Sequence, residues 1–407
     1  MRYFILCAFA FGVAGFDALA AGCEVTKPAD AILCAIENHP NVLASKAGAM
    51  TADAGRDIAS RWLNLELEGG AGYAEENGLR GAQIELGVMQ TIETPARRGA
   101  KKGRALAEYT HANAAAGGAG EQAAAEMLFI LNRLRQIDRE RRALDETIGT
   151  FARLVKKYNA RPALSPEDRV SKDLFGFALK NYDIERNRLA AENKKLLGNL
   201  NAILGIEKEM FVYPPRRWPA ISDDGFDSSA ELLKESANVI RANADYLGAK
   251  SSSFGGFRAG PYIQTAPGNT SRIDAYGVRF SMPLPLHFNF KLKEAGRASV
   301  AAAEYGMEAK RRELGAVLEN LKSQYAAGVS ILGTYDIDGM EKHHAETEKL
   351  FAGGRVGGAL LIEAHRQMVD SVRAYHGYEM ETLQALWGIY ILQRKLLRNL
   401  DEVYYEK

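Results

Sequence analysis

Two stretches of this chain, far apart in the sequence, end an alternating apolar pattern at a proline and continue into a basic, alanine-rich run. In QIELGVMQTIETPARRGAKKGRA, the apolar residues Ile84, Leu86, Val88 and Ile92 alternate with other residues until Pro95. AYGVRFSMPLPLHFNFKLKEAGRA repeats the pattern in the second half. Alternation with period two is typical of a β-strand, and proline is tolerated in the first turn of a helix. The sequence therefore predicts two strands that each lead into a long helix.

Four segments of the chain show this strand pattern. They span 61–73, 82–93, 256–266 and 272–284, and polar turn residues join them into two hairpins. Each is about as long as a tilted strand that crosses a bilayer, which needs roughly 9–11 residues. Four strands would leave two open edges, so a closed barrel requires several copies of the chain. The alternative is a pair of half-buried hairpins on a soluble sheet.

Apolar spacing predicts long helices after the strand hairpins. Apolar residues recur at steps of four and three from Ile130 to Tyr158, and again from Leu314 to Tyr335. A repeat of 3.5 residues is typical of helices that pack along a left-handed seam. A single helix from Pro95 to Tyr158 would be about 90 Å long. The stretch AAGGAG within it leaves a break possible, because clustered glycines weaken helices.

The order of elements occurs twice: short helix, strand hairpin, long helix, turn and returning helix. An internal repeat of this size indicates a structure with approximate symmetry. The strand hairpins are expected at 61–93 and 256–284, and the helical hairpins at 96–204 and 286–400. The expected divisions are a signal peptide at 1–22, a first repeat at 23–205, a linker at 206–225, a second repeat at 226–400 and a tail at 401–407.

The N-terminal segment has the features of a secretory signal peptide: Arg2, an apolar core, and small residues before Cys23. Beyond it, no run of about 18 apolar residues predicts a membrane-spanning helix. Once the signal is removed, Cys23 and Cys34 are the remaining cysteines. Two interpretations stay open: AAGC resembles a lipobox in which Cys23 is acylated, or the two cysteines form a disulfide in an oxidising compartment.

Composition and motifs argue against an enzyme. The formal net charge of +1 gives no reason to expect a nucleic-acid partner. The sequence contains no phosphate-binding loop, no G-x-S-x-G, no H-E-x-x-H and no paired-cysteine motif. We therefore predict no catalytic residues and no cofactor.

Histidines remain as candidates for metal chemistry. His343 and His344 could each pair with a glutamate at helical spacing. His365 and His376 share a helix face, but they lie about 16 Å apart along it, which is too far to hold one ion. Since a metal site needs several convergent ligands, we expect solvated surface histidines and no metal site.

Four motifs, in this order, resemble the outer-membrane efflux channels of the TolC type. They are AILCAIENHPNVLASKAGA, LGVMQTIETPARRGAKKGRALAE, YGVRFSMPLPLHFNFKLKEAGRASVAAAE and GRVGGALLIEAHRQMVDS. The resemblance covers nearly the whole mature chain. It implies a mainly α-helical homotrimer, in which each chain gives four strands to a shared twelve-stranded β-barrel in the outer membrane of a Gram-negative bacterium. The long helical hairpins would form an α-barrel in the periplasm.

The same resemblance explains the prolines and implies a function. Pro95, Pro283 and Pro285 would stand where the strands turn into the helices at the membrane surface. The implied function is the passive exit duct of a tripartite efflux or type I secretion system, coupled through a periplasmic adaptor to an inner-membrane transporter. The turn after Gly353 resembles members that serve pumps exporting heavy metals or drugs.

In members of this family, small glycine-containing turns at the helical tips meet the adaptor. The matching positions are Arg355, Val356, Gly357, Gly358, Ala359 and Leu360 in the second copy, and Arg161, Pro162, Ala163 and Leu164 in the first. Small residues would let a partner helix approach the backbone, whereas glycine and proline could instead only form the turn. We expect partner contact in the second copy, and turn formation in the first because Pro162 departs from the family pattern.

Glu363 matches an acidic position that rings the periplasmic entrance in family members. Three such carboxylates at a narrow axis would favour cations, and the alternative is a solvated helix face. Leu360 stands where some members carry a second acidic residue. A rival interpretation of the whole chain is a soluble periplasmic coiled-coil scaffold or adaptor, whose hairpins would form a small sheet.

Overall fold

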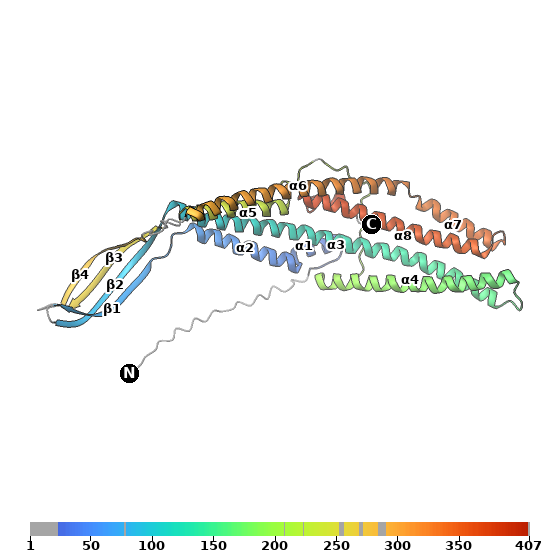
Figure 1. The fold of residues 1–407 in the computed structure, drawn as a ribbon. Helices are drawn as coiled ribbons and strands as arrows, with labels where there is room; N and C mark the ends of the chain where they lie inside the picture. The colour runs from blue at the N-terminus through green and yellow to red at the C-terminus, as the bar shows by residue number, and fades with distance from the viewer. Residues whose placement is uncertain are drawn as a thin grey trace, which may run out of the picture.

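The computed structural model describes residues 23–76, 79–206, 208–222, 224–251, 256–267, 272–283 and 290–405. The predicted signal peptide and Pro285 lie outside these residues. The molecule is elongated, with a sheet at one end and a long bundle of helices at the other (Figure 1). The mainly helical class with a small sheet, predicted from the sequence, is confirmed.

The sheet is a four-stranded antiparallel meander. Its strands are β1 (Glu66–Glu76), β2 (Leu79–Glu93), β3 (Gly256–Pro267) and β4 (Arg272–Ser281), in the spatial order β1-β2-β3-β4. β1 begins at Glu66 and not at the predicted position 61, because the preceding residues connect it to a helix and carry no strand pairing. β1 and β4 each pair with one neighbour within the described chain, so they form the two edges of the sheet.

The helices are α1 (Pro28–Asn38), α2 (Pro40–Ser60), α3 (Pro95–Asn159), α4 (Pro166–Leu204), α5 (Ala230–Lys250), α6 (Phe290–Thr334), α7 (Ile337–Ala352), α8 (Gly358–Leu392) and α9 (Leu400–Val403). α3 contacts α2 and α4 on one side and α5 and α8 on the other, and α6 packs on α5 and α8 (Figure 1). The long helices thus form a row. One edge of the row is α2 followed by α4, and the other is α6 followed by α7.

α3 is one continuous helix, so the possible break at AAGGAG does not occur. Its start is set by Pro95 in the first turn and by the side chain of Thr94, which accepts a hydrogen bond from the backbone N–H of Arg97. The glycines are used for close packing: a Cβ on Gly118 would lie 3.0 Å from the Cβ of Ala230 on α5. Tertiary contact therefore compensates for the low helix propensity of glycine.

The corresponding arm of the second half is interrupted, which the apolar spacing did not predict. α6 ends at Thr334, and α7 begins after Asp336, whose side chain accepts a hydrogen bond from the backbone N–H of Gly339 at 2.8 Å. Such a cap satisfies a free N–H at the start of a new helix. α7 is thus a separate segment between α6 and the turn that leads to α8.

The core runs along the middle of the helical bundle. The heptad positions Ile130, Leu134 and Ile137 of α3 are buried, as the 3.5-residue spacing predicted. The linker also packs on this core, since Val212 is fully buried. Next to it, Tyr213 exchanges two backbone hydrogen bonds of 3.0 Å with Tyr405 near the C-terminus.

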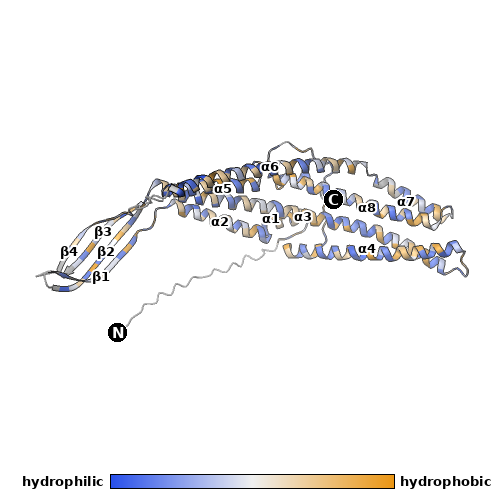
Figure 2. Ribbon diagram, in the orientation of Figure 1, coloured by the Kyte–Doolittle hydropathy of each residue, from blue (hydrophilic) through white to orange (hydrophobic). Residues whose placement is uncertain are grey.

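Polar and apolar residues are interleaved along the helices (Figure 2). Within the described part of the chain, none of the helices combines the length and the apolar character needed to cross a membrane.

Near the N-terminus, Cys23 and Cys34 are joined in a disulfide, with a distance of 6.0 Å between their Cα atoms. The bond ties the segment before α1 to α1 itself. Of the two interpretations left open by the sequence, acylation of Cys23 and a disulfide with Cys34, the structure contains the disulfide.

A carboxylate is buried in the middle of the bundle. Glu121 on α3 is 3% exposed, and its Oε2 lies 3.6 Å from Nε of Arg394. Burial raises the pKa of Glu121 to about 7, although Arg394 and Arg398 act in the opposite direction. Folding therefore favours the protonated form of this side chain.

Candidate functional site

One face of the sheet is apolar and open to the surroundings. Leu86 lies opposite Ile263, and Ile263 lies opposite Tyr276, so their side chains form a row on one face. Leu86 is 55% exposed and Tyr276 is 86% exposed. The exposed apolar residues on this face are Leu67, Tyr73, Ile84, Leu86, Val88, Ile263, Tyr276, Val278 and Phe280. An exposed apolar patch of this kind marks a surface that contacts another protein or lipid.

The opposite face of the sheet is polar and carries ion pairs. Arg258 of β3 pairs with Glu66 at 2.8 Å and also with Glu68 on β1. Arg279 of β4 pairs with Glu85 of β2. The alternation read from the sequence thus gives a sheet with one apolar and one charged face. Such a sheet can separate an apolar environment from an aqueous one.

The two helical hairpins turn at the end of the molecule away from the sheet (Figure 1). In the first hairpin, Ser165 caps α4 by accepting the backbone N–H of Asp168 at 3.0 Å, and Pro166 occupies the first turn. Arg161 donates to the carboxylate of Asp168 at 3.0 Å. Around it, Pro162 and Ala163 are exposed and Leu164 is half-buried. Arg161, Ser165 and Asp168 of this turn are therefore hydrogen-bonded to one another.

In the second hairpin, the turn between α7 and α8 contains Gly354 in the left-handed region, with φ at 68°. Arg355, Gly357, Ala359 and Leu360 are exposed, Val356 is half-buried and Gly358 is buried. Leu360 is 53% exposed, which gives the tip a free apolar side chain.

Gly358 has a role within the chain. A Cβ at this position would lie 3.1 Å from the ring of Phe175 and from Oγ of Ser171, both on α4. Phe175 is fully buried, and its ring also lies 5.1 Å from that of Phe151 on α3. The absence of a side chain at Gly358 therefore lets α8 approach α4, and this contact joins the two hairpins.

Glu363 lies on the first turns of α8 and is half-buried. Its carboxylate accepts hydrogen bonds from Arg366 at 2.6 and 2.9 Å and from Gln367 at 2.9 Å. These bonds lower the pKa of Glu363, so it is ionised at neutral pH. Arg366 partly neutralises that charge, which reduces the field that a ring of such carboxylates would produce.

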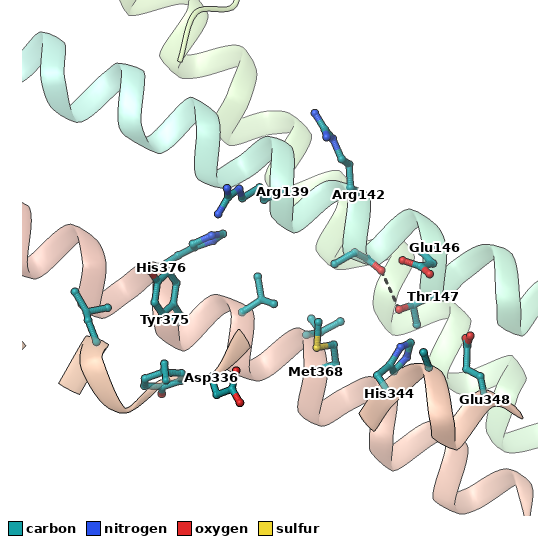
Figure 3. A pocket seen from close by; sticks show the side chains of 16 residues that line it. Arg139, Arg142, Glu146, Thr147, Asp336, His344, Glu348, Met368, Tyr375 and His376 are labelled. Carbon is teal, nitrogen blue, oxygen red and sulfur yellow. Dashed lines mark hydrogen bonds between the residues drawn. The ribbon is translucent and has the colours of Figure 1, made fainter. Parts of the chain in front are cut away.

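A cleft of about 830 Å³ lies between α3, α7 and α8 (Figure 3). His344 of α7 lines this cleft, and its Nε2 is 2.8 Å from Nδ1 of the buried His365 on α8. Glu348, one turn after His344, places Oε1 at 3.3 Å from Nε2 of His365. His365 is 1% exposed and His376 is 2% exposed, so the expectation of solvated histidines is wrong for these two residues. Burial, and then the nearby His344, lower the pKa of His365 to about 4, so the ring is neutral at pH 7.

A second buried polar cluster connects α3 to α8 further from the tip. The carboxylate of Glu379 accepts hydrogen bonds from Arg135 and from Gln136, the latter at 2.8 Å. His376, which is also buried, lies with Nδ1 at 2.8 Å from Oε1 of Glu140. Burial would raise the pKa of Glu140, but the hydrogen bond with His376 and the charge of a nearby arginine lower it. These groups hold the two long helices together through charged contacts.

Sequence reasoning missed both clusters, although a signal for them exists. Leu361, His365, Val369, Val372, His376, Glu379 and Leu383 follow one another at steps of four or three along α8. This spacing puts the polar members on the same buried stripe as the apolar ones. The partners on α3 and α7 could not be read from the sequence, because they come from distant segments.

Comparison with known proteins identifies the fold. No protein-family model matches the sequence, and no curated protein matches it either. Among solved structures, the outer-membrane channel OprN aligns with a TM-score of 0.72 at 15% identity, over 90% of this chain and 89% of that one. The CmeC outer membrane channel of Campylobacter jejuni aligns with a TM-score of 0.71 at 9% identity, over 93% and 87%.

The open state of the MtrE outer membrane channel of Neisseria gonorrhoeae gives a TM-score of 0.70 at 11% identity, over 90% of this chain and 89% of that one. At these identities the likeness concerns the fold. The chain has the fold of outer-membrane channels, and the resemblance to the TolC type is confirmed at this level.

Proposed function

We propose that this chain assembles as a homotrimer in the outer membrane of a Gram-negative bacterium, where it forms a passive exit duct. The two-faced sheet is the observation that carries the proposal. Its apolar face would contact lipid, and its charged face, with the ion pairs of Arg258 and Arg279, would line a water-filled lumen. Three copies would contribute twelve strands to one barrel.

The open edges of the single chain support assembly with further copies. β1 follows α2 in the chain and β4 precedes α6, so each sheet edge continues into one edge of the row of helices. An edge strand that presents unpaired backbone groups favours pairing with another strand. Head-to-tail contact of such edges closes into a ring when the rotation between copies fits. In the same ring of copies, the rows of helices would enclose a tunnel.

The edge helix α4 carries an apolar stripe that fits such a contact. Val170, Leu174, Phe177 and Ile184 are all exposed and recur at heptad spacing. Phe177 and Ile184 are each more than half exposed in the single chain. Helices with this spacing pack along a seam with a second helix, and the edge of a neighbouring copy supplies one.

Coupling to other proteins would occur at the helical tips. The exposed residues Arg355, Gly357, Ala359 and Leu360 would meet a periplasmic adaptor, which in turn would bind an inner-membrane transporter. The chain itself would hydrolyse nothing, and the energy for export of metals or drugs would come from that transporter. Glu363 would lie near the entrance, with its charge balanced in part by Arg366.

The first experiment is fractionation of cells that express the full-length chain, followed by size measurement in mild detergent. Recovery in the outer membrane as a trimer is expected, and conductance in planar bilayers follows as the functional test. Glu363→Gln should then lower cation preference slightly, because Arg366 already offsets the carboxylate. A water-soluble monomer or dimer would instead favour the periplasmic scaffold or adaptor.

A further inference from the structure

We propose that His344, Glu348 and His365 form a binding site for one divalent metal ion of the zinc class in each chain. The three side chains place their ligand atoms within 4.8 Å of one another. The site lies within a single chain, so the inference does not depend on assembly or on the proposed channel function.

The donor set fits zinc. Two imidazole nitrogens and one carboxylate oxygen are ligands that Zn²⁺ prefers, and three protein ligands leave a fourth position for water. Ligand atoms bound tetrahedrally at about 2.0–2.2 Å lie roughly 3.4 Å apart. Nε2 of His365 and Oε1 of Glu348 are 3.3 Å apart, which already matches this spacing. His344 and Glu348 are four residues apart on α7, so both project toward α8 from one face.

The hydrogen bonds around His365 leave one nitrogen unused. Nε2 is buried and has no hydrogen-bond partner among the described residues. On the other side of the ring, Nδ1 lies 2.8 Å from Nε2 of His344 and 3.3 Å from Oγ1 of Thr147, whose own hydroxyl donates to the carbonyl of Ala143 at 2.9 Å. Thr147 is thus an acceptor toward this ring, which favours the N–H on Nδ1. On zinc binding, Nε2 of His344 would turn from this N–H to the ion, and Thr147 would remain as the acceptor.

This arrangement places a lone pair opposite an anion. With its N–H on Nδ1, the ring of His365 directs the lone pair of Nε2 toward Oε1 of Glu348, 3.3 Å away. Two acceptors without a proton between them repel, and a cation between them removes the repulsion. A metal-bound histidine commonly donates its other N–H to a neighbouring oxygen, and Thr147 supplies that oxygen.

The ion would fasten α7 to the rest of the tip. α7 is separated from α6 by the interruption after Thr334, and its contacts with α8 hold it in place. His344 and Glu348 come from α7, whereas His365 comes from α8 (Figure 3 shows the two α7 side chains at the cleft). Binding would therefore restrict the movement of α7 next to the turn at Gly354. The open cleft gives the ion access from solvent.

The test uses the full-length protein in mild detergent, with any affinity tag removed and metals stripped by a chelator. ZnCl₂ is titrated against a fluorescent competitor, and metal content is measured after gel filtration. We expect about one zinc ion per chain and a rise in melting temperature on binding. Co²⁺ should give the visible absorption of a four-coordinate nitrogen and oxygen site.

Matched variants on α7 test the assignment of ligands. His344→Gln and Glu348→Gln should each weaken zinc binding at least about tenfold, since even loss of a supporting contact costs this much. His343→Gln is the control, because His343 is the adjacent residue and is exposed. Melting of each metal-free variant reports whether the fold is intact.

Two results would overturn the proposal. One is a wild-type protein that retains no zinc at micromolar concentrations, whatever the variants do. The other is equal weakening by His343→Gln and His344→Gln, which would indicate nonspecific binding by surface histidines.

Discussion

The apolar face of the sheet makes a specific prediction about charge. Leu86 is the middle residue of β2, and its side chain projects from the apolar face. If that face contacts lipid, Leu86→Arg places a charge near the middle of the bilayer. Arginine at the midplane of a transmembrane barrel costs about 2–4 kcal/mol. That cost corresponds to a decrease of about 30- to 700-fold in the ratio of folded to unfolded protein.

Gln83→Arg is the matched control on the same strand. Gln83 lies three residues earlier and projects from the opposite, polar face, opposite Gly72 of β1. The same charge should then reach water in the lumen, at a cost close to zero. Neither substitution removes an ion pair of the polar face, so the comparison isolates the face of the sheet.

Urea titration of the protein in phosphatidylcholine vesicles measures the effect. Tryptophan fluorescence should give a midpoint at lower urea for Leu86→Arg and a midpoint near wild type for Gln83→Arg. Recovery in the outer membrane of expressing cells should follow the same order. Equal midpoints for the two variants, or a larger loss for Gln83→Arg, would refute the assignment of the apolar face to lipid.

Three further predictions concern the helices. Glu379→Ala leaves its buried partner Arg135 without a counter-charge and should lower stability by about 3–5 kcal/mol. The melting temperature should fall accordingly, whereas the control Glu381→Ala, at an exposed position, should change the melting temperature little. Because folding raises the pKa of Glu121 to about 7, the contribution of this side chain to stability should be greatest below pH 4.5 and fall by about 3 kcal/mol as the pH rises to 7. Glu121→Gln should remove this part of the pH dependence, and an identical pH dependence in wild type and variant would contradict the assignment. Gly358→Val should collide with the aromatic ring of α4 and cost about 1–3 kcal/mol, while Gly357→Ala, at the neighbouring position, should melt as wild type.

The strands could be predicted from the sequence because their environment is recorded in every second residue. Leu86 and Val88 alternate with Glu85 and Gly87, and this alone assigned β2 and its two faces. The ends of the strands were less certain. The alternating pattern begins at position 61, but the residues before Glu66 do not pair with a neighbouring strand. Apolar residues at alternate positions are necessary for a two-faced strand, but hydrogen bonding to a neighbour decides where it begins.

The helices were predicted from the spacing of apolar residues, and their interruptions were not. Glycines at 115–120 suggested a break in α3 that close packing against α5 prevents. Conversely, apolar spacing continued to Tyr335, where the chain leaves α6 and Asp336 starts α7. In α3 the unfavourable preference of glycine is about 1 kcal/mol per residue, and packing against α5 outweighs it. At α7 the side chain of Asp336 caps a new helix, which the apolar spacing does not record.

The sequence by itself thus determined which faces of the strands and helices are apolar, because side chains repeat at fixed periods in regular structure. Only the tertiary structure decided which polar groups meet. His344 and His365 are separated by a turn of the chain, and Arg135 and Glu379 lie on helices from different halves of it. No local spacing encodes such contacts, since they depend on how α3, α7 and α8 lie against one another.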